Sequence, residues 1–66
     1  MAGNARGKLK EHTEGIHRNF DWVVVHCNAA INLMGEHHPE LQKAFKQLAT
    51  ATQQLDELTK SIYQKI

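Results

Sequence analysis

The sequence contains few of the residues that cross-link or rigidify a small domain. It has one cysteine, Cys27, so a disulfide within the chain is impossible. No spacing of cysteine and histidine matches a structural zinc site. A domain of 66 residues also buries only about 60% of the surface that its unfolded chain exposes. Because the chain has neither kind of cross-link, we expect association with another protein molecule to supply the missing stability.

Strong charge and long apolar runs are also missing. The net charge is +1, whereas nucleic-acid-binding domains usually carry a clear excess or a clustered face of basic side chains. The apolar run Val23–Val25 is far too short to cross a bilayer, and residues 1–10 contain no apolar segment of the kind found in secretion signals. We therefore expect a cytoplasmic protein that binds no membrane, and nucleic acid is not its expected partner.

Glycine and proline are rare, and two of them mark the one clear break in the chain. Gly35 suits the left-handed position that ends a helix, and Pro39 suits the first turn of the next helix, where its missing N–H is not needed. We predict a flexible N-terminus over residues 1–7, a first helix over about 8–34, a turn at 35–38 and a second helix over about 39–66. Such a short connection folds the second helix back, so the predicted fold class is all-α, an antiparallel two-helix hairpin.

Apolar residues recur at alternating steps of three and four, which is the pattern of helices packed at shallow angles. The same alternation continues through Thr13, Thr52 and Thr59. The residues predicted to form the core between the two helices are Ile16, Phe20, Val23, Cys27, Ala30, Met34, Leu41, Phe45, Leu48, Leu55 and Ile62. We expect two such hairpins to dimerise into a four-helix bundle.

The outer faces of the two predicted helices differ. The back of the second helix, from Lys43 to Gln64, is polar, so this helix is expected to need one partner surface. The back of the first helix adds a second apolar stripe, which we predict to bind a second copy of the chain or another protein. Its residues are Arg18, Trp22, Val25, His26, Ala29 and Leu33. Because monomers rarely expose so large an apolar patch, we predict a homodimer that uses mainly the first helix, with docking of a different protein as a compatible role.

Five histidines raise the question of metal or catalytic chemistry. His12 and His17 are too far apart in register to share a helix face, and His37 and His38 lie in the turn, where metal binding would be weak. Cys27 is expected to be a small core residue rather than a reactive thiol. The carboxylates of Asp56 and Glu57 are expected in solvent. We predict a non-enzymatic protein with no catalytic residue, no cofactor and no metal site.

In length and hairpin form, with an exposed stripe from Trp22 to Leu33, the chain resembles the small anti-quorum-sensing inhibitors encoded by Pseudomonas phages. The resemblance includes no shared motif. It implies a dimer of two-helix chains that blocks a host transcription activator. Our leading prediction is therefore a regulator that acts by occluding the surface of a partner protein.

Two alternatives belong to other functional classes. The plasmid RNA-binding regulator Rop is similar in size and in four-helix architecture, and the cluster of Arg6, Lys8 and Lys10 could contact phosphates. The chain could also be a structural coiled-coil subunit of a larger assembly. Salt-dependent retention on RNA or DNA would favour the first alternative, and the lack of any partner besides the chain itself would favour the second.

Overall fold

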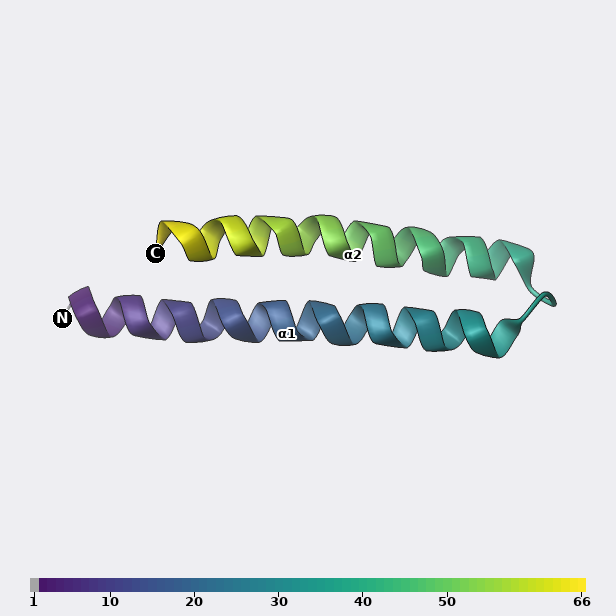
Figure 1. The fold of residues 1–66 in the computed structure, drawn as a ribbon, viewed down its shortest axis with the longest axis horizontal. Helices are drawn as coiled ribbons and strands as arrows, with labels where there is room; N and C mark the ends of the chain where they lie inside the picture. Colours follow the sequence, from purple (N-terminus) through teal and green to yellow (C-terminus); the bar gives the residue numbers. More distant parts are fainter. Residues whose placement is uncertain (1) are drawn as a thin grey trace.

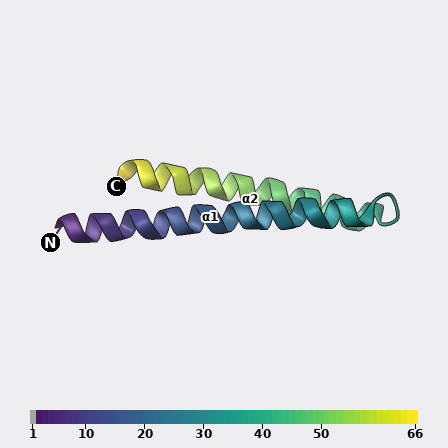
Figure 2. The ribbon, with the colours of Figure 1, turned by 60° about the horizontal axis from the view of Figure 1, so that its bottom comes forward.

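The computed structural model describes residues 2–66, with side chains from residue 5 onward. Helix α1 (Ala2–Met34) and helix α2 (Pro39–Lys65) lie side by side and run in opposite directions (Figure 1, Figure 2). The hairpin measures 55 × 15 × 10 Å, so it is long and flat and has two broad sides. The predicted all-α antiparallel hairpin is confirmed. Neither described helix combines the length and the apolar character that crossing a membrane requires.

The turn has the structure that its glycine and proline predict. Gly35 has a φ of 57°, in the left-handed region that glycine adopts without steric cost. Its N–H donates to the carbonyl of Ile31 at 3.3 Å, and its own carbonyl accepts from the Gln42 side chain at 3.0 Å. Pro39 occupies the first turn of α2, while His38 precedes it without a side-chain capping bond. These local bonds close the turn and fix where both helices meet it.

The N-terminal boundary of the first helix was predicted incorrectly. Helix α1 begins at Ala2 rather than near residue 8, so residues 2–7 are helical, while Met1 lies outside the described residues. Alanine, arginine, lysine and leucine favour helices, and between residues 2 and 10 they outnumber Gly3 and Gly7. The expected separate N-terminal segment is therefore a continuation of α1.

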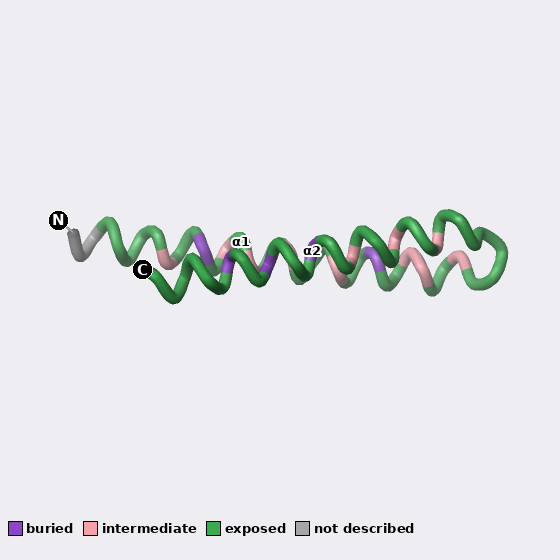
Figure 3. Tube along the Cα trace, turned by 90° about the horizontal axis from the view of Figure 1, so that it is seen from above, coloured by how far each residue is buried: buried purple, intermediate pink, exposed green. Residues whose placement is uncertain are grey.

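The contact between the helices is narrow and partly polar. Its most buried apolar side chain is Cys27, at 3% exposure, and the buried polar residues are Thr13, Thr52, Asp56 and Thr59. Figure 3 shows these positions recurring along the two helices between exposed ones. Each threonine hydroxyl donates to the carbonyl four residues earlier in its own helix, at 2.7 to 3.3 Å. Because the hydroxyls have these partners, the threonines can face the opposite helix without leaving a buried polar group unsatisfied.

The predicted core is confirmed only in part. Phe20, Cys27, Ala30, Met34 and Phe45 are buried or half-buried in the structure. The other six predicted core residues are 37–54% exposed, and these are Ile16, Val23, Leu41, Leu48, Leu55 and Ile62.

The reason is the rotation of each helix about its own axis. The line of α2 residues that faces α1 runs through Phe45, Ala49, Thr52, Asp56 and Thr59, all of which are buried or half-buried. At about 100° per residue, the leucines of α2 lie roughly 90° around the helix from this line.

The structure therefore also contradicts the prediction that the second helix needs one partner surface. Helix α2 faces α1 with one side and leaves a second, apolar side uncovered. We use the name open face for the uncovered apolar positions that flank the contact between the two helices. Its residues are Leu9, Ile16, Val23, Leu41, Leu48, Leu55, Leu58 and Ile62, which are 37–62% exposed.

Candidate functional site

The outer stripe of α1 lies where the sequence predicted it, on the side away from α2. We call it the α1 ridge, formed by Arg18, Trp22, Val25, His26, Ala29 and Leu33, and all six residues are exposed. Trp22 is 62% exposed, Val25 53% and Leu33 88%. Trp22 and Ala29 lie about 180° around α1 from the line that faces α2. The ridge therefore contributes little to the hairpin's own packing.

The indole of Trp22 lies beside an aromatic neighbour one turn along α1. Its ring centroid lies 6.0 Å from that of His26, with an angle of 33° between the two planes. This separation is within the range of favourable aromatic contacts. An aromatic side chain already ordered on the free helix loses less conformational entropy when it is buried in a partner.

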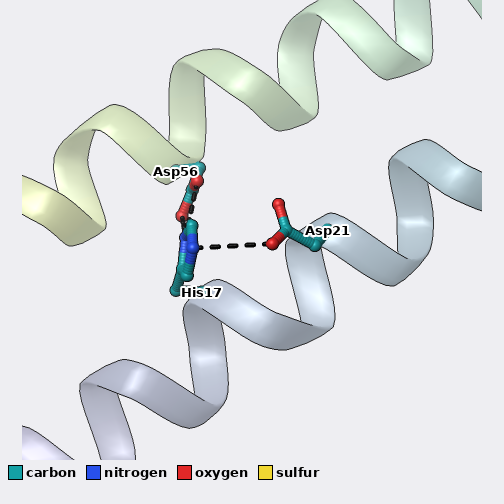
Figure 4. A group of neighbouring side chains, drawn as sticks. All are labelled: His17, Asp21 and Asp56. Carbon is teal, nitrogen blue, oxygen red and sulfur yellow. Dashed lines mark hydrogen bonds and ion pairs between the residues drawn. The ribbon is translucent and has the colours of Figure 1, made fainter.

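A second cluster joins the two helices and was not predicted. Nδ1 of His17 on α1 lies 2.8 Å from both carboxylate oxygens of Asp56 on α2. Nε2 of the same ring lies 3.5 Å from Oδ2 of Asp21, one turn along α1 (Figure 4). Both ring nitrogens of His17 therefore face a carboxylate, and the His17–Asp56 contact joins the two helices. We call this cluster the clamp.

The position of Asp56 corrects an expectation from the sequence. Its carboxylate was expected in solvent, but the residue is 8% exposed because it belongs to the line of α2 that faces α1. The sequence-based comparison of His12 with His17 concerned a single helix, whereas the partner of His17 lies on the other helix. His17 and Asp56 are equidistant from the turn, and residues with that relation oppose one another in an antiparallel hairpin. This relation was the signal in the sequence that could have found the pair.

The clamp has some features of a metal site. His17, Asp21 and Asp56 can each offer one ligand atom, and these atoms lie within 4.8 Å of one another. However, Nδ1 of His17 is already bound to Asp56. Nε2 and Asp21 remain, and they supply fewer ligands than the three or four found in protein zinc sites. The geometry therefore favours a structural role for the cluster.

A shallow hollow of about 320 Å³ lies beside the clamp, and His17 forms part of its lining. The hydroxyl of Tyr63 donates to Oε1 of Glu14 at 3.1 Å across this hollow, and Nζ of Lys10 lies 5.5 Å from the centre of the Tyr63 ring. The hydrogen bond to Glu14, the negative charge of that carboxylate and partial desolvation together raise the pKa of Tyr63 above its ordinary value. The hollow is thus crossed by a second polar link between the helices.

The hollow does not assemble a nucleophile with the His17–Asp56 pair. Of the hydroxyls that line it, those of Thr13 and Thr59 donate to carbonyls of their own helices, and that of Tyr63 donates to Glu14. Acyl transfer by a histidine–carboxylate pair needs a hydroxyl or thiol hydrogen-bonded to the histidine. Among the described residues, the nearby hydroxyls are used for structure.

Comparisons of the chain with protein-family models, with curated proteins and with solved structures found no match. The resemblances to phage inhibitors and to Rop, and the homodimer that both imply, stay predictions.

Proposed function

We propose that this chain is a non-enzymatic binding protein that uses the α1 ridge to occupy a groove on another protein and so block it. The observation that carries the proposal is the exposure of Trp22, Val25 and Leu33 on the side of α1 that α2 does not cover. Large apolar side chains in this position stabilise a complex more than they stabilise the isolated hairpin.

The spacing of the α1 ridge suits recognition of a helix by a groove. Trp22, Val25, Ala29 and Leu33 follow one another at steps of three and four, which is how an amphipathic helix presents its anchors to a hydrophobic groove. Trp22 is the expected central anchor, because tryptophan and arginine dominate the binding energy of many interfaces. Arg18 lies one turn before it and can pair with a carboxylate at the rim of the partner.

Occlusion is the mode of action that fits this surface. A long rigid helix that fills a groove excludes whatever the groove normally binds, and it needs no chemistry of its own. The resemblance to small phage-encoded inhibitors implies the same mode, with a host transcription activator as the blocked protein.

The test is affinity capture from the lysate of the native host, followed by titration of the captured protein in pure form. Trp22→Ala should weaken the complex roughly thirtyfold or more, which corresponds to about 2 kcal/mol for a central anchor. Gln54→Ala, on the back of α2, is the matched control and should bind like the unchanged chain. If the unchanged chain, Trp22→Ala and Gln54→Ala bind with equal affinity, the α1 ridge is not the binding surface. Retention of the chain on RNA or DNA that falls with salt would instead favour the Rop-like alternative.

A further inference from the structure

The open face is an apolar surface that the proposed function leaves unused. Its α2 members Leu41, Leu48, Leu55 and Ile62 recur every seven residues, as do Leu9, Ile16 and Val23 on α1. A heptad repeat is the spacing that keeps one seam of a helix against a neighbouring helix along its whole length. All of these residues are exposed in the hairpin, so both repeats lack the neighbour to which their spacing is suited.

The two repeats lie on the same broad side of the hairpin. The other broad side of the hairpin carries two hollows. Glu14 and Lys60 line one of them, and Asp21 and Gln53 line the other. On each helix, the heptad residues lie on the other side of the line of buried and half-buried residues that faces the neighbouring helix, displaced from it by roughly 70°. The heptad residues of both helices therefore lie on one broad side of the hairpin, and the His17–Asp56 pair and the two hollows lie on the other.

The size and shape of the open face indicate what covers it. The hairpin is 55 Å long and 15 Å wide, and the heptad residues of α2 extend along most of that helix, so the open face is long and narrow. Two parallel rows of aliphatic residues fit two further helices packed at a shallow angle. Ala44 and Ala51, also exposed on α2, alternate with its leucines and leave room for close approach.

A second copy of the chain supplies two such helices with the same repeats. An interface between identical faces closes by a two-fold axis, so the open face of each copy is used up in the dimer. The net charge of +1 offers little electrostatic opposition to pairing. The single hairpin also has almost no apolar core of its own. Among the described residues, Cys27 is the one apolar side chain that is buried.

We propose that a second copy of the chain covers the open face and forms a four-helix-bundle dimer whose core consists of the heptad residues of both helices. This assignment differs from the sequence-based expectation that the dimer uses mainly the first helix. It leaves Trp22, Val25 and Ala29 of the α1 ridge outside the dimer core, whereas Leu33 lies closer to the open face. The inference does not depend on the proposed partner binding, since Trp22 and Val25, the main proposed anchors, lie on the far side of α1.

The test is sedimentation equilibrium at micromolar concentration on the unchanged chain and three variants. The unchanged chain should have twice the 7.5 kDa mass of one molecule. Leu48→Ala and Leu55→Ala should each weaken the dimer by roughly tenfold or more, because each removes an apolar side chain from both copies at the interface. Val25→Ala is the matched control, since Val25 is 53% exposed and Leu55 is 50% exposed, and it should leave the dimer intact.

Alanine favours the helix, so these variants retain the local structure of the hairpin. In a folded monomer, the two leucine variants would change an exposed side chain and have little effect on stability. In the dimer, they should lower the unfolding temperature, and that temperature should rise with protein concentration. A folded monomer whose unfolding does not depend on concentration would overturn the proposal, as would a dimer that Val25→Ala disrupts and the leucine variants do not.

Discussion

The clamp between His17 and Asp56 should be the strongest polar interaction between the two helices. A hydrogen bond to a charged group contributes about 1.5–3 kcal/mol to stability. The Asp56 side chain is 12% exposed, but that of His17 is 41% exposed, so water weakens the interaction and we expect the lower part of that range. The predicted coupling free energy between His17→Ala and Asp56→Ala is therefore about 1–2 kcal/mol.

The assay is a double-mutant cycle in which urea unfolding is followed by far-ultraviolet circular dichroism. All chains must be measured at one concentration, because self-association would change the apparent stability. The control is the cycle between His17 and Asp21, whose atoms are 3.5 Å apart and whose side chains are 41% and 66% exposed. Exposed pairs one turn apart contribute about 0.3–0.5 kcal/mol. If the His17–Asp56 coupling is no larger than this control, the reasoning that the buried carboxylate clamps the helices is wrong.

Three further predictions concern single positions. Gly15→Ala should stabilise the hairpin by about 1 kcal/mol in urea unfolding, because an added Cβ meets nothing within 4 Å; a loss of stability would contradict this. Gly35→Ala should destabilise it by about 1 kcal/mol, since its φ of 57° is costly for other residues, and unchanged urea unfolding would count against the turn structure. Glu14→Ala should lower the pKa of Tyr63 toward its ordinary value in a spectrophotometric titration. Because the pKa of Tyr63 is raised in the folded chain, its hydrogen bond to Glu14 contributes fully to folding stability below the ordinary pKa of tyrosine. That contribution is lost as the pH rises through the raised pKa.

The parts of the fold that depend on local sequence could be predicted. Gly35 and Pro39 impose backbone conformations that end one helix and begin the next, whatever the rest of the chain does. The exposure of Trp22 and Leu33 could also be predicted, because their register places them on the side of α1 opposite its heptad seam. The binding role of that surface stays a prediction.

The rotation of α2 about its axis could not be predicted. Its apolar stripe is wide enough to face α1 either through Leu48 and Leu55 or through Phe45 and Thr52, and helical periodicity alone does not choose between these arrangements. The structure has the second arrangement, in which Asp56 reaches His17. In this rotation of α2, Asp56 forms a polar pair with His17, and the leucines of α2 lie on the open face.

We propose that the hairpin uses two apolar surfaces, the open face for a second copy and the α1 ridge, centred on Trp22, for another protein. Trp22 is the single tryptophan of the chain, so its fluorescence reports on the ridge alone. The most direct measurement is quenching of this fluorescence by iodide across a dilution series in which self-association is followed in parallel. We predict that Trp22 stays accessible to iodide as the dimer forms, whereas protection that increases with dimer formation would show that the ridge itself is the self-association surface.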